Sequence, residues 1–407
     1  MGTMKIAMFL DQSFPPDSRV ENEAYSLIKA GHEVHLFSLS YQKVKLKREE
    51  VNGIAVHRYK AGKLTYKLSA LAYTFPFFHR IVRKKVVRFL DEVKPDAIHV
   101  HDMLIAQAVM DVNSKSGKPL HLTLDLHEDR PEIMQFYPHL KKFPGKYLIN
   151  IDVWRKKQKE LIQRADKVVL VTKEAVERAM TITGEPDSKF IPLPNTIEKD
   201  IYFNYTIDKR ITRKLKKGFD IVYVGDTGLR RGTDTAIRAL RLLIEKVPQA
   251  QLILVGKSTE DIHLVKLVEE LGLSAHIIFE GWQDVSLFPS YIDGAEVCIS
   301  PLHRNLHHDT TYANKIFQYM AGERPLLVSD CTAQANVVKA AECGLVFEAE
   351  NPQAMAACLL ELYNNPTEAR KMGGNGLRAV QEHYHWGNTS KALISFYQEL
   401  AESLTAS

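Results

Sequence analysis

The sequence has 407 residues, of which 45% are hydrophobic and 25% are charged, and its formal net charge is +5. This balance is typical of a packed globular protein and excludes an intrinsically disordered chain. The length predicts two domains, each large enough to bury its own core. The mild positive charge does not by itself indicate a nucleic-acid partner.

The first residues predict a strand and not a targeting segment. Residues 1–11 lack a basic region followed by an apolar stretch and a small-residue cleavage site, so we expect no secretory signal. The least polar stretch, residues 70–78, has about half the length that spans a bilayer. We therefore expect a soluble, cytoplasmic protein that contacts, at most, the inner face of a membrane.

The cysteines all lie in the second half of the chain. They are scattered and form no Cys-x-x-Cys pair, so the sequence indicates neither a zinc site nor a disulfide. Reduced thiols packed in the core are the expected state. The four residues are Cys298, Cys331, Cys343 and Cys358.

Short apolar, β-branched runs alternate with amphipathic stretches of helical length from one end of the chain to the other. The first unit combines a strand at residues 5–10, a helix, and a strand at residues 33–39. The helix has an apolar stripe at helical spacing from Val20 to Ile28, and Gly31 ends it. Such a β-α-β unit builds a parallel sheet.

Two series of strands follow this pattern, separated by a polar, basic segment at residues 197–217 that we interpret as a linker. The first series continues at residues 97–101, 121–127 and 167–172, and residues 193–196 close it. The second series is expected at residues 220–225, 251–256, 276–280, 296–301, 325–330 and 344–347.

The sequence therefore predicts an α/β protein with two Rossmann-like, doubly wound parallel-sheet domains. The N-terminal domain takes residues 1–196, and the C-terminal domain takes residues 218–388. Residues 389–407 form a final helix, which we expect to return to the N-terminal domain.

Polar residues gather where two first-half strands end, which is where open parallel sheets bind ligands. His99 and His101 share one face of their strand, just before Asp102, and Asp125 and His127 repeat this arrangement. A buried polar side chain needs a partner, and a cleft position provides one. For His99 the alternative is a core histidine satisfied by a backbone carbonyl. Histidine is well suited to bond a substrate hydroxyl or to hold a proton near neutral pH.

A glycine-containing turn follows the first strand of the second half. It runs from Gly225 to Gly232, and a helix is expected to begin near Thr233. Glycine lets the backbone approach a ligand closely, and Arg230 and Arg231 suit phosphate oxygens. The turn has neither a Gly-x-Gly-x-x-Gly fingerprint nor a Walker lysine, so the alternative is a tight turn with solvated arginines.

Residues 300–322 carry the most information about a ligand. A strand ends at Ser300, a polar loop follows, and a helix is expected to begin near Thr310, capped by this residue or by Asp309. The start of that helix, together with the charge of Lys315, favours a nucleoside diphosphate. The alternative is a capped surface helix with a solvated polar stripe: Thr311, Lys315 and Gln318.

His307 and His308 lie next to each other in the same loop. Adjacent histidines lack the spacing of metal ligands, and no third ligand is evident. We therefore expect no metal here.

Six segments in order resemble the retaining family 4 glycosyltransferases, which have the GT-B fold, and the resemblance covers essentially the whole chain. The segment Asn314-Lys315-Ile-Phe-Gln318-Tyr-Met-Ala is similar to the family's donor-binding helix. The strand end Asp125-Leu-His127-Glu128 resembles the one that carries the family's active-site histidine. The other segments are the first loop and helix at residues 17–34, then residues 95–102, 194–195 and 225–232.

The resemblance implies transfer of a sugar from a nucleoside diphosphate donor, with retention, to a glycan or lipid-linked acceptor in surface polysaccharide or glycolipid synthesis. It also implies two domains facing across a cleft and no metal or other cofactor, because cationic side chains stabilise the departing diphosphate. The implied catalytic residues are His127, Arg231 and Lys315. The implied donor-binding residues are Gly225, Asp226, Thr227, Gly228, Arg230, Gly256, Thr310, Thr311, Asn314 and Gln318, and the implied acceptor-side residues are Arg19, His99, His101, Asp102 and Glu128.

The sequence departs from the family pattern at three places. Thr310 and Gln318 stand where the family usually has two glutamates, Asp226 replaces a phosphate-binding arginine, and residues 15–16 are prolines where a glycine pair is usual. Two alternatives therefore stay open. One is a nucleotide-sugar epimerase on the same fold, which turns over donor without acceptor, and the other is a non-catalytic partner protein, which binds donor poorly.

Residues 41–90 contain thirteen lysines and arginines against two acids, and they include several aromatic residues. Such a mixture suits an anionic membrane surface, where a lipid-linked acceptor would be found. The alternative is a solvated basic face beside a packed core. No nucleic-acid recognition module is evident, so we expect no nucleic-acid partner.

Overall fold

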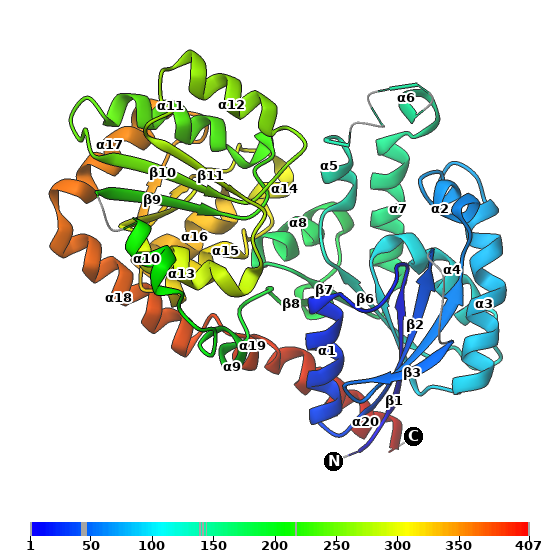
Figure 1. Cartoon of the computed structure of the whole chain (residues 1–407). Helices are drawn as coiled ribbons and strands as arrows, with labels where there is room; N and C mark the ends of the chain where they lie inside the picture. The colour runs from blue at the N-terminus through cyan, green and yellow to red at the C-terminus, as the bar shows by residue number, and fades with distance from the viewer. Residues whose placement is uncertain are drawn as a thin grey trace. The chain divides into compact units, whose positions relative to one another are not determined.

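The computed structural model describes residues 2–41, 47–137, 140, 142–143, 145–215 and 218–405. The chain forms two compact units (Figure 1). Unit 1 comprises residues 1–194 and 390–407, and unit 2 comprises residues 195–389. Each unit is built on a largely parallel sheet flanked by helices, so the α/β class predicted from the sequence is confirmed.

The sheet of unit 1 has eight strands in the order β3-β4-β2-β1-β5-β6-β7-β8. All neighbours pair in parallel except β3 and β4, which are antiparallel. The strands are β1 (Lys5–Leu10), β2 (Glu33–Ser40), β3 (Arg48–Val51), β4 (Ile54–Lys60), β5 (Ala97–His101), β6 (His121–Leu126), β7 (Lys167–Leu170) and β8 (Phe190–Pro192).

Burial along these strands follows their place in the sheet. The central strand β5 is buried along its whole length, as expected for a parallel strand covered on both faces. The edge strand β3 carries Arg48, Glu49 and Glu50 and is largely exposed, and such charges protect a sheet edge from pairing with another chain. The sequence analysis did not predict β3, because a short charged strand lacks an apolar run, and it also missed β4 and β8.

Helix α1 shows why the first β-α-β unit forms. The side chain of Asp17 caps the helix by accepting from the amide of Val20. Val20, Ala24 and Leu27 are fully buried on one face. The helices of unit 1 are α1 (Ser18–Lys29), α2 (Lys63–Ser69), α3 (Phe77–Val93), α4 (Met103–Asn113), α5 (Arg130–Met134), α6 (Gly145–Leu148), α7 (Ile151–Arg164), α8 (Lys173–Thr183) and α20 (Lys391–Thr405).

The sheet of unit 2 has six parallel strands in the order β11-β10-β9-β12-β13-β14. All six were predicted from the sequence, and their observed ends lie within one residue of the expected ones. They are β9 (Phe219–Val224), β10 (Ala250–Val255), β11 (Ile277–Gly281), β12 (Val297–Ser300), β13 (Leu326–Ser329) and β14 (Gly344–Phe347).

The segment interpreted as a linker, residues 197–217, contains two short helices that belong to unit 2. The Tyr202 hydroxyl donates to the carbonyl of Gln318 at 2.8 Å, so this segment packs against the unit. The helices of unit 2 are α9 (Lys199–Tyr202), α10 (Lys209–Leu215), α11 (Thr233–Leu243), α12 (Asp261–Glu270), α13 (Phe288–Gly294), α14 (Leu306–Asp309), α15 (Lys315–Ala321), α16 (Thr332–Ala340), α17 (Pro352–Asn364), α18 (Pro366–Glu382) and α19 (Trp386–Thr389).

Two further features bear on the expectations above. The described cysteines are all free thiols, and Cys298, Cys331 and Cys343 are buried, as expected for core residues. Within the described ranges, no helix has the length and apolar character needed to cross a bilayer.

Candidate functional site

Unit 1 holds a buried ion-pair network at the carboxyl ends of β5 and β6. The Arg19 guanidinium, from α1, binds Asp125 with two hydrogen bonds of 2.7 and 3.0 Å. It also lies 2.9 Å from the carboxylate of Glu23 and donates to the carbonyl of Leu193 at 2.8 Å. Both carboxylates are fully buried, so the arginine supplies the positive charge that makes their burial tolerable.

His127 joins this network and is partly exposed, with 17% of its side chain accessible. Its Nε2 lies 2.9 Å from Asp125, and its Nδ1 lies 3.7 Å from Asp102. Burial lowers the pKa of His127, but the charges of Asp102 and Asp125 outweigh it and raise the pKa to about 10. This raised pKa favours the protonated form of His127 at neutral pH.

Asp102 has a backbone conformation that suits this role. Its φ is +61°, which is uncommon for a residue other than glycine. In this conformation its carboxylate accepts from the amide of His127 at 3.2 Å. Strain of this kind persists where surrounding contacts enforce it, often at functional sites.

His99 and His101 were placed on the acceptor side by the sequence analysis, but both side chains are fully buried. His99 Nδ1 lies 2.9 Å from the hydroxyl of Tyr397 on α20, and its Nε2 lies 3.3 Å from Glu23. His101 Nδ1 lies 3.1 Å from Asp125. These two rings support the network and do not reach a ligand without rearrangement.

Glu23, His99, His101 and Asp125 resemble a metal-ligand set, since one donor atom from each lies within 4.8 Å of the others. However, the guanidinium of Arg19 already binds both carboxylates. A divalent ion would have to displace this counter-charge, so the donor set does not fit a metal. Nearby, Glu128 forms a 2.9 Å ion pair with Arg130.

In unit 2, glycines bring three loops close together. Gly225 follows β9 with a φ of +110°, and Gly256 follows β10 with a φ of +152°. A Cβ at Gly256 would lie 1.8 Å from the carbonyl oxygen of Gly225, and a Cβ at Gly232 would lie 1.7 Å from that of Pro301. These positions require glycine, because a side chain at either one would overlap the backbone of the neighbouring loop.

Lys315 lies beneath this turn at the start of α15. Its ammonium is buried and has no hydrogen-bond partner among the described residues. The Nζ atom lies 3.5 Å from the ring centroid of Tyr223, and it would lie 3.3 Å from a Cβ at Gly225. Burial and the charge of Arg231 hold the pKa of Lys315 well below its usual range.

Two arginines of the turn lie close enough to Lys315 to act on its charge. Arg231 Nε lies 3.3 Å from the Asp226 carboxylate, and Arg230 Nη2 lies 3.9 Å from the same oxygen. Asp226 also accepts from the amide of Gly228 at 3.1 Å. The structure thus brings Gly225, Asp226, Gly228 and the three cations together at one turn.

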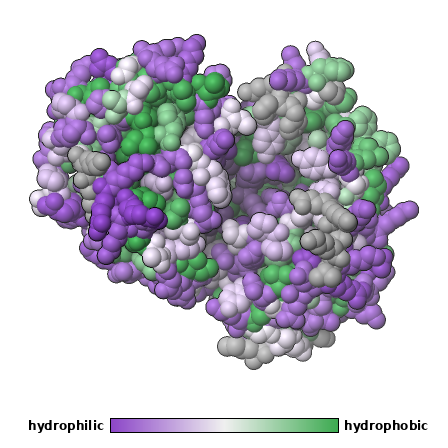
Figure 2. All heavy atoms as spheres, viewed as in Figure 1, coloured by the Kyte–Doolittle hydropathy of each residue, from purple (hydrophilic) through white to green (hydrophobic). Residues whose placement is uncertain are grey.

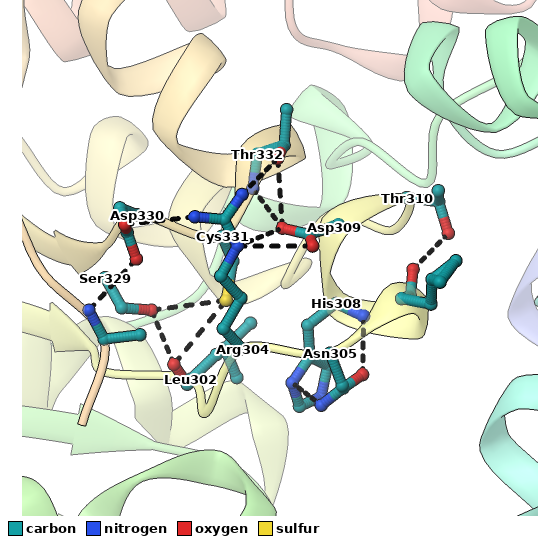
Figure 3. A network of polar contacts seen from close by, with 12 residues as sticks. Leu302, Arg304, Asn305, His308, Asp309, Thr310, Ser329, Asp330, Cys331 and Thr332 are labelled. Carbon is teal, nitrogen blue, oxygen red and sulfur yellow. Dashed lines mark hydrogen bonds and ion pairs between the residues drawn. The ribbon is translucent and has the colours of Figure 1, made fainter.

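The loop before α15 differs from the expected single helix, and its anchors are drawn in Figure 3. Arg304 lies between Asp309, at 3.4 Å, and Asp330, at 3.2 Å. Asp309 also accepts from the amide of Thr332 at 2.8 Å. Since Asp309 is used in this way, it does not cap a helix that begins at Thr310, and the prediction of that helix start was wrong.

Instead, the loop forms two short helices. Asn305 caps α14 by accepting from the amide of His308 at 3.0 Å, and Thr310 donates back to the carbonyl of Leu306 at 2.9 Å. Helix α15 begins only at Lys315. Thr311 therefore lies outside the helix that carries Lys315 and Gln318, and these three side chains do not form one helical stripe.

The remaining residues that the sequence analysis expected on the donor side differ in burial and in position along the chain. Thr227 is buried, and its hydroxyl bonds to Asp261. Asn314 is the N-cap residue of α15, and Gln318 lies one turn into that helix. The sequence analysis missed Glu23, Tyr223, Arg304 and Tyr397, whose partners are distant in the chain. It also missed Asp11, which directly follows β1 and therefore obeys the strand-end rule.

Comparisons with known proteins agree with these features. The family model "Glycosyl transferase 4-like domain" matches residues 16–196, and "Glycosyl transferases group 1" matches residues 204–378. The phosphatidyl-myo-inositol mannosyltransferase of Mycolicibacterium smegmatis is 22% identical over 412 residues, covering 98% of this chain and 94% of that protein. The putative glycosyltransferase EpsD of Bacillus subtilis is 27% identical over 162 residues, which is 40% of this chain and 41% of EpsD.

A solved structure extends the likeness in fold. Anabaena HepE in complex with UDP superposes with a TM-score of 0.69 and is 15% identical, over 99% of this chain and all of that one. At this identity the likeness concerns the fold alone. With both family models matched, one in each half, the chain belongs to the group 1 glycosyltransferases, enzymes of the GT-B fold.

Proposed function

We propose that this glycosyltransferase takes its sugar from a nucleoside diphosphate donor bound at the turn of residues 225–232 and Lys315. The observation that carries the proposal is the buried ammonium of Lys315, which has no hydrogen-bond partner among the described residues. A buried, unpaired cation costs free energy, and a diphosphate oxygen would remove that cost. Arg230 and Arg231 would then share the remaining negative charge.

The same groups suit the chemistry of transfer. Charge develops on the diphosphate as the sugar leaves, and fixed cations at that place stabilise the transition state. We expect no metal or other cofactor in this step. The protonated His127 would donate a hydrogen bond to the reacting sugar or its acceptor.

We further propose that transfer retains the anomeric configuration. Because His127 holds its proton at neutral pH, it does not take the proton of the acceptor hydroxyl. The departing diphosphate is a base that can take this proton, which favours attack from the side on which it leaves. The acceptor would be a glycan or a lipid-linked glycan in surface polysaccharide or glycolipid synthesis. The named activity of the M. smegmatis relative, on a phosphatidyl-myo-inositol, supports a lipid-linked acceptor.

Thermal unfolding in the presence of nucleoside diphosphates and nucleotide sugars tests the donor site. A ligand of the native state raises the melting temperature. We expect the melting temperature to rise with at least one nucleoside diphosphate. The Lys315→Ala variant should need at least ten times more of that ligand for the same rise. Lys339→Ala, on the exposed surface of α16, is the control and should leave the rise unchanged. No rise with any nucleotide would contradict the proposal.

Product analysis separates transfer from the alternative chemistry. NMR of the new glycosidic bond should show the anomeric configuration of the donor. Conversion of the donor to an epimer without any acceptor would instead identify a nucleotide-sugar epimerase.

We also propose peripheral contact with an anionic membrane around α2. Leu64 and Tyr66 are 70% and 62% exposed, and the exposed Lys63 and Lys67 lie on the same short helix. Figure 2 shows hydrophobic and hydrophilic residues intermixed at the surface over α2 and α6. Residues 42–46 of the basic segment lie outside the described residues. Apolar and cationic side chains together favour an anionic interface.

Co-sedimentation with vesicles tests this contact. Wild-type protein should bind vesicles containing phosphatidylglycerol more tightly than vesicles of phosphatidylcholine alone, and added salt should weaken the binding. Lys63→Glu should reduce the bound fraction severalfold, whereas Lys339→Glu should not. Equal binding by both variants would place the contact elsewhere or exclude it.

A further inference from the structure

Unit 1 contains a cavity of about 540 Å³. None of the residues proposed to bind the donor lines this cavity. Its lining includes Asp11 and Tyr41, just beyond the carboxyl ends of β1 and β2. The wall also includes Tyr66 of α2, Arg130 of α5 and Trp154 of α7. The volume lies in the range of pockets that enclose small molecules.

Aromatic rings form much of this wall. The rings of Tyr41 and Tyr66 meet edge to face with their centroids 5.2 Å apart. Trp154 is held against Tyr73 in a second edge-to-face pair at 4.7 Å, which fixes the indole. Flat rings of this kind pack well against the C–H faces of a sugar ring, and tyrosine and tryptophan add polar edges for its hydroxyls.

Asp11 gives the pocket a hydrogen-bond acceptor close to the site of reaction. Burial raises the pKa of Asp11 to about 6, against the opposing charge of Arg130, and Asp102 and His127 also act on it. Asp11 is therefore in the same electrostatic neighbourhood as His127. At neutral pH its carboxylate is ionised in a place that solvates it poorly, so a ligand hydroxyl that donates to it would be favoured.

Two further polar atoms of the wall lack partners. The Tyr41 hydroxyl and the Trp154 indole N–H have no hydrogen-bond partner among the described residues. Buried polar atoms are rarely left in this state, and ligand oxygens within reach would satisfy them. A purely aliphatic ligand would leave the Asp11 carboxylate, the Tyr41 hydroxyl and the Trp154 N–H without hydrogen-bond partners.

The charges of the pocket favour a neutral occupant over a phosphate. The carboxylate of Asp11 would repel an anion, and the guanidinium of Arg130 already binds Glu128 at 2.9 Å. A compound with many hydroxyls and little charge matches what remains.

We propose that this pocket binds a sugar ring of the acceptor, with the Asp11 carboxylate accepting a hydrogen bond from one of its hydroxyls. The proposal rests on the transfer function proposed above, and it narrows the acceptor to one that presents a glycan, free or lipid-linked, at this pocket. Asp11 is then a substrate-binding residue that holds the acceptor beside His127.

Saturation-transfer NMR with a panel of methyl glycosides tests the pocket directly. We expect at least one of methyl α-glucoside, α-mannoside, α-galactoside and N-acetyl-α-glucosaminide to bind the wild-type protein. Asp11→Leu should weaken that binding at least tenfold, and Asp11→Asn should weaken it less because an amide oxygen still accepts. Asp91→Leu is the matched control, since Asp91 is exposed and lines a different cavity of unit 1.

The outcomes separate this proposal from the donor site. The melting-temperature rise with nucleoside diphosphates depends on unit 2 and should be unchanged in both Asp11 variants. If nucleotides bind but no glycoside does, or if Asp11→Leu binds glycosides like the wild type, the sugar pocket is excluded and the donor site stands. If glycosides bind through Asp11 but no nucleotide binds, the pocket stands and the transferase proposal fails. Binding of hexanol in place of the glycosides would identify a lipid pocket and would also overturn the proposal.

Discussion

The ammonium of Lys315 lies 3.5 Å from the centre of the Tyr223 ring, and both belong to unit 2. Without a ligand, the buried charge is compensated by this cation–π contact, worth about 2 kcal/mol at a desolvated site, and by the nearby charge of Asp226. The protein therefore keeps at this place a charge that destabilises its free form.

Replacement of Lys315 by methionine should separate stability from donor binding. Lys315→Met removes the buried charge but keeps the contact with the Tyr223 ring, so we expect the melting temperature of the free protein to rise by a few degrees. The affinity for nucleoside diphosphates should fall at least tenfold. Differential scanning fluorimetry with and without nucleotide measures both effects. If the ligand-free Lys315→Met variant melts at a lower temperature than the wild type, the buried charge of Lys315 does not destabilise the protein.

The same variant makes a prediction about pH. Because the pKa of Lys315 is lowered on folding, the unfolded chain binds more protons between the lowered value and about 10.4. Wild-type stability should therefore rise with pH in this interval, relative to Lys315→Met. The difference in melting temperature between the two proteins should shrink as the pH approaches 10, and a constant difference would contradict the assignment.

Asp226 should compete with the donor for the arginines. Its carboxylate lies 3.3 Å from Arg231 and 3.9 Å from Arg230, so a diphosphate must displace it and meets its negative charge. We expect Asp226→Asn to tighten nucleoside diphosphate binding about threefold to tenfold, measured by isothermal titration calorimetry. Asp200→Asn, on an exposed position of α9, is the control. Weaker binding by Asp226→Asn would mean that the carboxylate orients the arginines for the ligand.

His127 should act through its proton. Its pKa of about 10 predicts that activity does not decline between pH 7 and 9 through loss of this proton. His127→Gln keeps a neutral donor and should retain more transfer than His127→Ala, while both bind nucleotide like the wild type. An activity that appears only above pH 6.5, as neutral imidazole forms, would show that His127 is a base.

The raised pKa of His127 also stabilises the folded protein. The folded state holds the proton more tightly than the unfolded chain, so the stabilisation is fully present below about pH 6.5 and is lost as the pH rises through about 10. Thermal melts of wild type and His127→Gln across this interval should converge at the alkaline end.

Arg19 should be the most sensitive residue of the buried network. Arg19→Met leaves the carboxylates of Asp125 and Glu23 without their counter-charge, which typically costs about 3–5 kcal/mol. We expect a strong loss of melting temperature, partly recovered in Arg19→Lys. Arg48→Met, at the exposed edge strand β3, is the control and should melt close to the wild type. A small effect of Arg19→Met would mean that the two carboxylates take up protons instead.

Much of the fold was predictable because buried parallel strands are apolar along their whole length. All six strands of unit 2 were found this way, whereas β3 was missed because Arg48, Glu49 and Glu50 fill it. The strand-end rule also indicated His127, and the glycine turn indicated Arg231, and their roles in the site stay predictions. The strand-end rule applied equally to Asp11, but a single aspartate after a strand has no pattern that distinguishes it from other residues.

The rest of the site depends on contacts between distant residues. The hydrogen bond from the amide of Thr332 to Asp309 interrupts the helix that the sequence favours at Thr310. Similarly, the partner of His99 is Tyr397, 298 positions away. Local periodicity contains no information about such pairs, so the sequence placed Thr310 at a helix start and left open whether His99 lies in a cleft or in the core.

Helix α20 has a consequence for how the protein is made. It supplies Tyr397 to His99 in unit 1, although all of unit 2 separates the two parts of unit 1 along the chain. During synthesis on the ribosome, the first 194 residues emerge long before α20 does. Until then, the surface of unit 1 that α20 covers has no packing partner. Unit 2 is continuous and is thus the first part of the chain able to complete its folding.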